Sequence, residues 1–266
     1  MTPLTSIKNP TIKKVIALNK KRGRDLHGQF LVEGIREVEM ALEAGLQPVE
    51  ALLNPHWDNE ALQQFITRLE GTNVYKLDND VFDKISYRDS VANVVAVFPL
   101  FNTNLARLEL ASNALVLVLE AIEKPGNLGA IFRTADAAGI DAVIITNANT
   151  DFYNPNVIRA SLGTVFTVPF AIASNDETLS YLSEKQFNIY STYLNATEPH
   201  FNVDMKRSTA LVMGSEANGI TSHWVENADQ CIKIPMRGKA DSMNVSTSAA
   251  VVIYEAIRQR NAQCLH

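Results

Sequence analysis

The sequence has little cysteine and no recognisable arrangement of metal-binding residues. Its 266 residues include two cysteines, Cys231 and Cys264, which are far apart and lack the C-x-x-C spacing of zinc and redox sites. We therefore expect neither a disulfide framework nor a zinc site, and a reducing cytoplasm suits such a chain. The five histidines are scattered without an H-x-x-x-H or H-E-x-x-H pattern, so no metal is expected.

Long apolar runs and common nucleotide-binding motifs are also missing. No apolar run approaches the length that spans a bilayer, and the first residues, MTPLTSIKNP, lack the apolar core of a signal peptide. We expect no membrane association. The sequence contains no G-x-G-x-x-G fingerprint, no Walker G-x-x-x-x-G-K-[ST] loop and no G-x-S-x-G nucleophile elbow. These absences argue against a Rossmann dinucleotide site, a P-loop and an α/β-hydrolase.

Basic residues are fewer than acidic ones, but they are unevenly distributed. The chain has 24 Lys and Arg against 29 Asp and Glu, a net charge of −5, which by itself disfavours a nucleic-acid-binding protein. Seven basic residues nevertheless precede Phe30: Lys8, Lys13, Lys14, Lys20, Lys21, Arg22 and Arg24. A local basic segment can bind phosphates, because charges farther away than about 8–10 Å are screened at physiological salt. A solvated N-terminal segment accounts for the same charges equally well.

The first hundred residues predict a small α/β domain. Helices are expected at 13–20, 35–44, 59–69 and 81–85, with Gly23 and Gly28 ending the first, and strands at 29–32, 49–53, 73–76 and 93–98. A polar stretch without clear periodicity follows. We interpret residues 101–113 as a linker between a domain at 1–100 and a second at 114–266, since 266 residues suit two domains of ordinary size.

The second region predicts an α/β domain with a mostly parallel sheet. Residues 114–120 (ALVLVLE) and 141–146 (DAVIIT) are apolar runs typical of strands that are buried on both faces. Further strands are expected at 165–171, 188–192, 209–213 and 230–234, and helices at 127–138, 154–160, 176–185 and 245–260. Strands that alternate with helices place helices on both faces of the sheet. Ligands of such sheets bind beyond the carboxyl ends of the strands.

Three polar clusters fall at those strand ends. After the first strand, Asn127 stands at the expected start of a helix that carries Arg133, and a helix N-terminus with an arginine can bind an anion. After strand 209–213, Gly214 and Gly219 bracket Glu216, and glycine permits close backbone approach to a ligand. Each cluster also has an ordinary explanation, a helix cap in the first case and a solvated loop in the second.

The third cluster follows strand 230–234 and reads IPMRGKADSMNVS over residues 234–246. Ser242 and Asn244 precede an unusually apolar last helix, and we expect one of them to cap it. Capping does not explain why a polar loop joins two deeply buried elements.

In this order and spacing the clusters resemble the three motifs of the SpoU (TrmH-like) family of SPOUT methyltransferases. N-x-G-x-x-x-R-x-A matches residues 127–135, and G-x-E-x-x-G matches 214–219. I-P-M-x-G and then S-L-N-V-S match 234–238 and 242–246, with Met243 in place of leucine, a residue of similar volume. The resemblance covers about residues 114–262. Residues 6–37 resemble, less specifically, the ribosomal-protein-like substrate-binding domain of ribosomal-RNA methyltransferases.

The resemblance implies a fold and a reaction. Residues 114–266 would form a SPOUT domain with a C-terminal trefoil knot, usually a homodimer, that methylates a ribose 2′-hydroxyl with S-adenosylmethionine. Ribosomal RNA is the favoured substrate and transfer RNA the alternative. The implied catalytic set is Arg133, Asn127, Glu216, Ser242 and Asn244. The implied cofactor-binding set is Gly214, Ser215, Ile234, Met236 and Met243. The implied RNA-binding set is Lys13, Lys14, Lys20, Lys21, Arg22 and Arg24.

Two other interpretations were weighed. A class I Rossmann-type methyltransferase needs a glycine-rich first turn, which Gly126-x-x-Gly129 imitates poorly. A non-catalytic RNA-binding protein with a vestigial site would be expected to lack Arg133, Glu216 or Asn244, and all three are present. Within the enzyme hypothesis, an arginine is a poor base because its pKa lies above about 12. We therefore interpret Arg133 first as a clamp on RNA and leave the proton acceptor open.

Overall fold

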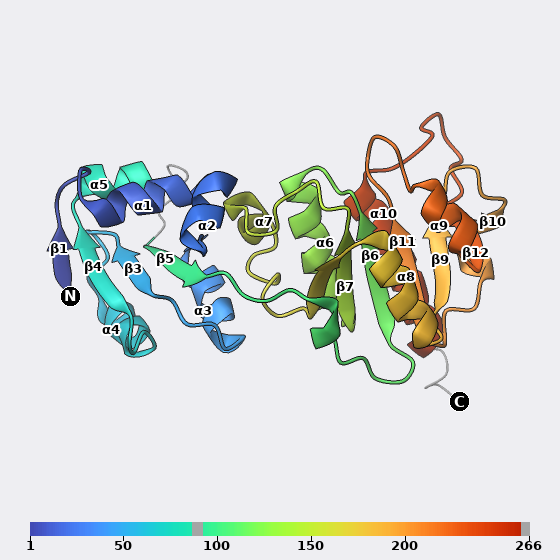
Figure 1. Cartoon of the computed structure of the whole chain (residues 1–266), viewed down its shortest axis with the longest axis horizontal. Helices are drawn as coiled ribbons and strands as arrows, with labels where there is room; N and C mark the ends of the chain where they lie inside the picture. The colour runs from blue at the N-terminus through green and yellow to red at the C-terminus, as the bar shows by residue number, and fades with distance from the viewer. Residues whose placement is uncertain (87–92, 262–266) are drawn as a thin grey trace. The chain divides into compact units, whose positions relative to one another are not determined.

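The computed structural model describes residues 1–86 and 93–261, which form two compact units (Figure 1). The first unit contains Met1–Asn102 together with Asp151–Thr167, and the second contains the remaining described residues. Each unit is built around its own sheet, one of five strands and one of seven. The stretch interpreted as a linker includes Leu105 and Leu108, which are buried in the core of the second unit.

The first unit has a mixed sheet in the order β1-β4-β3-β5-β2. Strands β1, β4 and β3 are parallel, whereas β5 is antiparallel to both β3 and β2. The strands are β1 (Thr2–Leu4), β2 (Gln29–Glu33), β3 (Glu50–Leu53), β4 (Asn73–Leu77) and β5 (Val94–Pro99). The helices are α1 (Pro10–Leu18), α2 (Lys21–His27), α3 (Ile35–Glu43), α4 (Glu60–Thr67) and α5 (Asn79–Ile85). Apolar residues of α1 and α5 pack on one face of this sheet and form its core.

Two helices occupy the N-terminal region where the sequence predicted one. Helix α1 begins at Pro10, after Asn9 accepts a hydrogen bond from the Thr11 N–H (2.8 Å), and it ends at Leu18. The prediction that Gly23 breaks a helix was wrong, because Gly23 lies inside α2. A Cβ at Gly23 would lie 2.0 Å from the Ala17 carbonyl oxygen, so glycine permits close approach of the two helices.

A segment that leaves the second sheet belongs to the first unit. Residues 151–167 follow β7 and include α7 (Pro155–Ala160), which opens with the expected Asn154–Pro155 cap. The ring of Tyr153 lies 4.9 Å from that of Phe30, and its hydroxyl donates to the Phe101 carbonyl oxygen (2.8 Å). The predicted strand 165–171 was wrong: the strand is β8 (Phe170–Ala173). The apolar run is instead explained by packing, since the Phe166 ring lies 6.0 Å from Phe30.

The second unit confirms the predicted parallel sheet. Its order is β10-β12-β9-β11-β6-β7-β8, and every neighbouring pair is parallel. The strands are β6 (Leu115–Glu120), β7 (Ala142–Thr146), β8 (Phe170–Ala173), β9 (Asn188–Thr192), β10 (Glu198–Pro199), β11 (Thr209–Met213) and β12 (Gln230–Lys233). The helices are α6 (Pro125–Ala138), α8 (Asn175–Glu184), α9 (Ser222–Asn227) and α10 (Val245–Asn261), with short turns η1 (Leu105–Arg107) and η2 (His200–Asn202).

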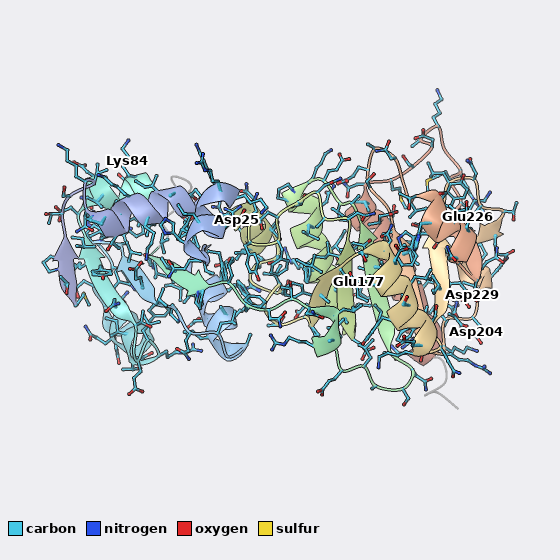
Figure 2. The ribbon with its side chains drawn as sticks, in the orientation of Figure 1. Asp25, Lys84, Glu177, Asp204, Glu226 and Asp229 are labelled. Atoms are coloured by element: carbon cyan, nitrogen blue, oxygen red, sulfur yellow. The ribbon has the colours of Figure 1, made fainter. Side chains whose placement is uncertain are left out.

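Both faces of this sheet are covered, which explains its continuous apolar strands. Leu182 of α8 and Trp224 of α9 pack with alternate residues of the strands on one face. Helices α6 and α10 contact each other, and α10 contacts β11. Polar side chains hold the amino ends of the strands: Asp141 accepts from the Leu115 N–H, and Asp229 (Figure 2) from the Ile189 N–H, each at 2.7 Å. Because the faces and the amino ends of these strands are occupied in this way, we expect the polar loops at the carboxyl ends of the strands to form the site.

Arg24 provides a test of how the first unit is held together. Its side chain is 3 % exposed, and its guanidinium donates to Asp151 Oδ2 (2.9 and 2.6 Å) and to the Leu18 carbonyl oxygen (2.8 Å). Removing one partner of a buried ion pair costs about 3–5 kcal/mol. We expect Arg24→Ala to lower the free energy of unfolding by that amount in urea titrations. Lys21→Ala, which removes the exposed pair with Asp25, should change it by less than about 1 kcal/mol. Equal effects of the two substitutions would contradict this assignment.

Candidate active site

The three polar clusters meet where the direction of strand order reverses. From β6 the chain passes to β7 and β8 on one side, whereas β11 and β9 lie on the other. Ligands of open parallel sheets bind at such a switch point, outside the carboxyl ends of the strands. The loops that follow β6 and β11 therefore lie where sheets of this kind have their ligand crevice, and the chain after β12 returns to the same place before α10.

Asn127 joins the three clusters through its side-chain amide. Its Nδ2 group donates a short hydrogen bond to Glu216 Oε1, and its Oδ1 atom accepts from Asn244 Nδ2 (3.1 Å). The prediction that Asn127 is the N-cap was wrong. The helix starts at Pro125, the N-cap is Lys124, and Asn127 is the third helical residue. Because proline begins the helix without an N–H to satisfy, the asparagine amide is free to bind the other two loops.

The loop after β11 is a tight hairpin. Ser215 and Gly219 exchange backbone hydrogen bonds of 3.0 Å in both directions. A Cβ at Gly214 would lie 2.1 Å from the Gly219 carbonyl carbon and 2.2 Å from the Ile220 nitrogen. The sequence pattern predicts a glycine that admits a ligand here. The structure gives a more immediate reason, since the loop's own backbone occupies that space.

Glu216 is held in its charged form by the site. Burial raises the pKa of Glu216. Hydrogen bonds from the Asn127 amide and from backbone N–H groups, together with the charge of Lys124, lower the pKa by more than burial raises it. The net pKa lies below the ordinary glutamate value. The Glu123 N–H also donates to Glu216 Oε2 (3.3 Å). A depressed pKa means that these contacts stabilise the fold above the ordinary glutamate pKa and lose that effect as the pH falls through the lowered value.

The segment after β12 is open to a ligand. Ile234, Met236 and Met243 are apolar and half-buried. Within the described part of the chain, no backbone N–H from Met236 to Met243 donates a hydrogen bond. Apolar walls beside unused backbone groups suit a flat, partly polar cofactor such as an adenosine derivative.

One residue of this segment caps the last helix, as predicted. Asn244 Oδ1 accepts from the Ser246 N–H (2.9 Å) and hydroxyl (2.6 Å). The Ser242 hydroxyl bonds Asp241 Oδ1 (3.3 Å) and does not reach Asn127 among the hydrogen bonds of the described residues. Asn244 thus joins the central cluster, while Ser242 lies in the exposed part of the loop.

Arg133 lies apart from this network. It is the ninth residue of α6, and at 1.5 Å per residue its Cα lies about 12 Å along the axis from Pro125. The side chain is exposed, and no hydrogen bond or ion pair joins it to another described residue. Gly126 precedes it by seven residues, two helical turns, and nothing lies within 4 Å of a Cβ added there. The geometry places a free guanidinium beside the crevice rather than within it.

Glu120 is a further site residue that the sequence analysis missed. It ends β6, is completely buried, and accepts hydrogen bonds from Thr221, Asn175 and Asn147. The available signal was an acidic residue that closes an otherwise apolar strand, since a buried carboxylate needs dedicated partners.

The predicted RNA-binding residues divide by exposure within the first unit. Lys13, Lys20, Lys21 and Arg22 are exposed. Lys14 is paired with Glu50 (2.8 Å), and Arg24 is buried in its pair with Asp151. We therefore assign Arg24 to the packing of the unit and keep only exposed side chains in the proposed RNA surface.

The described residues include no group of three or more His, Cys, Asp or Glu side chains that could hold a metal ion. Cys264 lies outside the described residues. None of the helices described is long and apolar enough to cross a membrane.

Comparison with known proteins defines the class of this fold and site. The family model described as "SpoU rRNA Methylase family" matches residues 114–254, and that of an "MRM3-like substrate binding domain" matches residues 9–96. A crystal structure of an AdoMet-bound rRNA methyltransferase from Sinorhizobium meliloti is similar over 97 % of both chains, with a TM-score of 0.89 and 28 % identity. Both units thus have the architecture of an RNA methyltransferase.

Two curated relatives extend over nearly the whole chain. The Bacillus subtilis (strain 168) 23S rRNA (guanosine(2553)-2′-O)-methyltransferase RlmP is 30 % identical over 96 % of this chain and 98 % of its own. The 23S rRNA (uridine(2479)-2′-O)-methyltransferase of Streptomyces viridochromogenes is 29 % identical over 91 % of this chain and 87 % of its own. The chain belongs to the SpoU rRNA methylase family.

Gly214 offers a test of the hairpin. We expect Gly214→Ala to raise the Kd for S-adenosylmethionine at least tenfold, about 1.4 kcal/mol, because a Cβ would displace the Gly219–Ile220 backbone. Isothermal titration calorimetry provides the measurement. Gly126→Ala is the matched control, since nothing lies within 4 Å of a Cβ there. An unchanged Kd for Gly214→Ala would show that the hairpin does not shape the cofactor site.

Proposed function

We propose that this protein methylates the 2′-hydroxyl of a ribose in ribosomal RNA with S-adenosylmethionine as methyl donor. The observation that carries the proposal is the convergence of Asn127, Glu216 and Asn244 at the switch point of a parallel sheet. Relatives that span nearly the whole chain are named for this reaction on 23S rRNA. Their names differ in the nucleotide, guanosine in one and uridine in the other.

The cofactor would bind against two loops. Gly214 and Ser215 of the hairpin supply backbone, and Ile234, Met236 and Met243 supply apolar contacts. Bound S-adenosylmethionine supplies an electrophilic methyl group on a sulfonium sulfur. The fit rests on the unused backbone N–H groups from Met236 to Met243 and on the half-buried apolar side chains beside them.

The protein's own residues would position the nucleophile. A ribose hydroxyl is a weak nucleophile, so its orientation and the removal of its proton decide the rate. Arg133 can grip an RNA phosphate with its planar guanidinium and fix the adjacent ribose. Asn127, Glu216 and Asn244 would hold the loops, and the exposed Ser242 would contact RNA. Arg133 itself would not accept the proton of the hydroxyl, because its guanidinium stays charged.

Assembly and chain threading are part of the same proposal. After β12, the second strand from one edge of the sheet, the chain returns toward β11 and β6 at the centre. There α10 packs against α6 and β11, a path that suits a trefoil knot. Tyr254 of α10 is half exposed and directly follows the apolar stretch Ala249–Ile253, which suits an isologous homodimer. The proposed RNA substrate would be met in the cytoplasm.

Arg133 tests the reaction type. We expect Arg133→Ala and Arg133→Lys to lower kcat about 10²-fold or more, while the Kd for S-adenosylmethionine stays within twofold, because only RNA positioning is lost. The assay is transfer of a labelled methyl group to ribosomal RNA from cells that lack this protein. A substrate with a 2′-deoxy target nucleotide should bind without being methylated. Methylation of that substrate would place the chemistry on a base and refute the proposal.

The exposed basic residues test RNA docking. We expect Lys20→Ala with Arg22→Ala to weaken RNA binding and to reduce the slope of log K against log salt by about 1.4, or 0.7 for each lost phosphate contact with single-stranded RNA. Lys206→Ala with Arg207→Ala is the control, since both side chains are exposed and precede β11 at the amino end of the sheet. Equal slopes for the two double variants would exclude a specific role for the first unit's basic surface.

A further inference from the structure

Glu120 is the most buried acidic residue among the described residues of the second unit, and its carboxylate accepts four hydrogen bonds. The side chain has no exposed surface. Its Oε2 atom accepts from the Thr221 N–H (2.7 Å), and its Oε1 atom accepts from the Thr221 hydroxyl (2.8 Å), Asn175 Nδ2 (2.6 Å) and Asn147 Nδ2 (3.3 Å). A carboxylate accepts on both oxygens, which an amide of the same shape cannot do.

The partners of Glu120 come from three different parts of the second unit. Thr221 ends the hairpin after β11, Asn147 follows β7, and Asn175 begins α8. Asn175 Oδ1 in turn accepts from Trp224 Nε1 (3.1 Å), and Trp224 is completely buried. One carboxylate thus fastens the carboxyl ends of β6, β7 and β11 to the buried core.

The Thr221 side chain bonds to Glu120 instead of capping the helix that follows it. It is the N-cap residue of α9, where a threonine hydroxyl commonly accepts a hydrogen bond from the second or third helical N–H. Here the side chain makes no capping bond and donates to Glu120 instead. The hairpin end is therefore positioned by the strand, not by the helix that follows.

We propose that Glu120 is a positioning residue that preorganises the 214–221 hairpin for the cofactor. The hairpin is closed internally by the Ser215–Gly219 pair, held on one side by Glu216 and Asn127, and held at its end by Thr221 and Glu120. A loop fixed before binding loses less conformational freedom when its ligand arrives. This inference rests on the proposed function only in identifying the ligand as S-adenosylmethionine.

The test compares substitutions at the two ends of the same strands. Glu120→Gln keeps the volume and removes one acceptor, and Thr221→Val removes the hydroxyl from an exposed residue and should fold normally. Asp141→Asn and Thr209→Val are the matched controls, because Asp141 accepts from the Leu115 N–H (2.7 Å) and Thr209 donates to the Arg207 carbonyl oxygen (2.8 Å) at the amino ends of β6 and β11. The full chain is used throughout.

Two measurements separate the inference from the proposed function. Hydrogen–deuterium exchange of the cofactor-free protein should be at least threefold faster over 214–221 in Glu120→Gln and Thr221→Val, and unchanged there in the controls. The Kd and KM for S-adenosylmethionine should rise at least tenfold in Glu120→Gln and severalfold in Thr221→Val, while kcat at saturating cofactor stays within threefold. A merely structural role would lower the Tm of controls and test variants alike without this KM-against-kcat split.

The outcomes are distinct. Unchanged exchange over 214–221 in both Glu120→Gln and Thr221→Val overturns the positioning role, whatever reaction the enzyme performs. Faster exchange with an unchanged Kd supports the anchoring of the hairpin and overturns its assignment to the cofactor, which is the part shared with the proposed function. Should Glu120→Gln fail to fold, Thr221→Val decides by the same two measurements.

Discussion

The side-chain amide of Asn127 is the contact on which the candidate site depends. It donates to Glu216 and accepts from Asn244, which lie 89 and 117 residues farther along the chain. An aspartate could not donate and a serine could not reach both partners, so the position requires a donor and an acceptor on one short, planar group. This contact helps to lower the pKa of Glu216 against the effect of burial, and Asn244 couples the same point to the start of α10. The loops that follow β6, β11 and β12 are thereby fixed relative to one another.

The parallel sheet makes that contact possible. With helices on both faces, the strands are apolar on both sides, and polar groups are confined to the strand ends. The switch point brings the ends of β6 and β11 together although nearly a hundred residues separate them. Glu120 is the one acidic side chain within β6, and it is tolerated because four donors from the neighbouring strand ends and α8 offset its burial. Polar groups at the carboxyl ends of these strands are thus hydrogen-bonded to one another and not only to solvent.

Much of this arrangement could be predicted from the sequence, and the failures share a cause. Apolar runs such as 114–120 and 141–146 predicted buried strands, and the position of each cluster after a strand predicted that the clusters lie at the carboxyl ends of the sheet. Asn127 was misassigned as a cap because Pro125 can begin a helix two residues earlier. The predictions for Gly23 and for residues 165–168 were wrong for the same reason. Gly23 permits close approach of α1, and Phe166 packs against Phe30, but neither contact can be distinguished in the sequence from a helix break or from the start of a strand. Only tertiary contacts distinguish these cases.

Arginine shows most clearly what sequence pattern cannot decide. Arg24 stands among basic residues and was assigned to RNA, yet it is buried and its guanidinium is engaged by Asp151 and Leu18. Arg133 lies in a largely apolar helix, yet it is exposed and has no partner among the described residues. A guanidinium that is already satisfied within the fold stabilises it, whereas one that is left unsatisfied beside a preorganised crevice can bind a phosphate with no internal contact to break. The same division separates the hairpin 214–221, whose backbone and side chains are hydrogen-bonded within the fold, from the segment 236–243, whose backbone N–H groups donate to no described residue and are therefore available to a ligand.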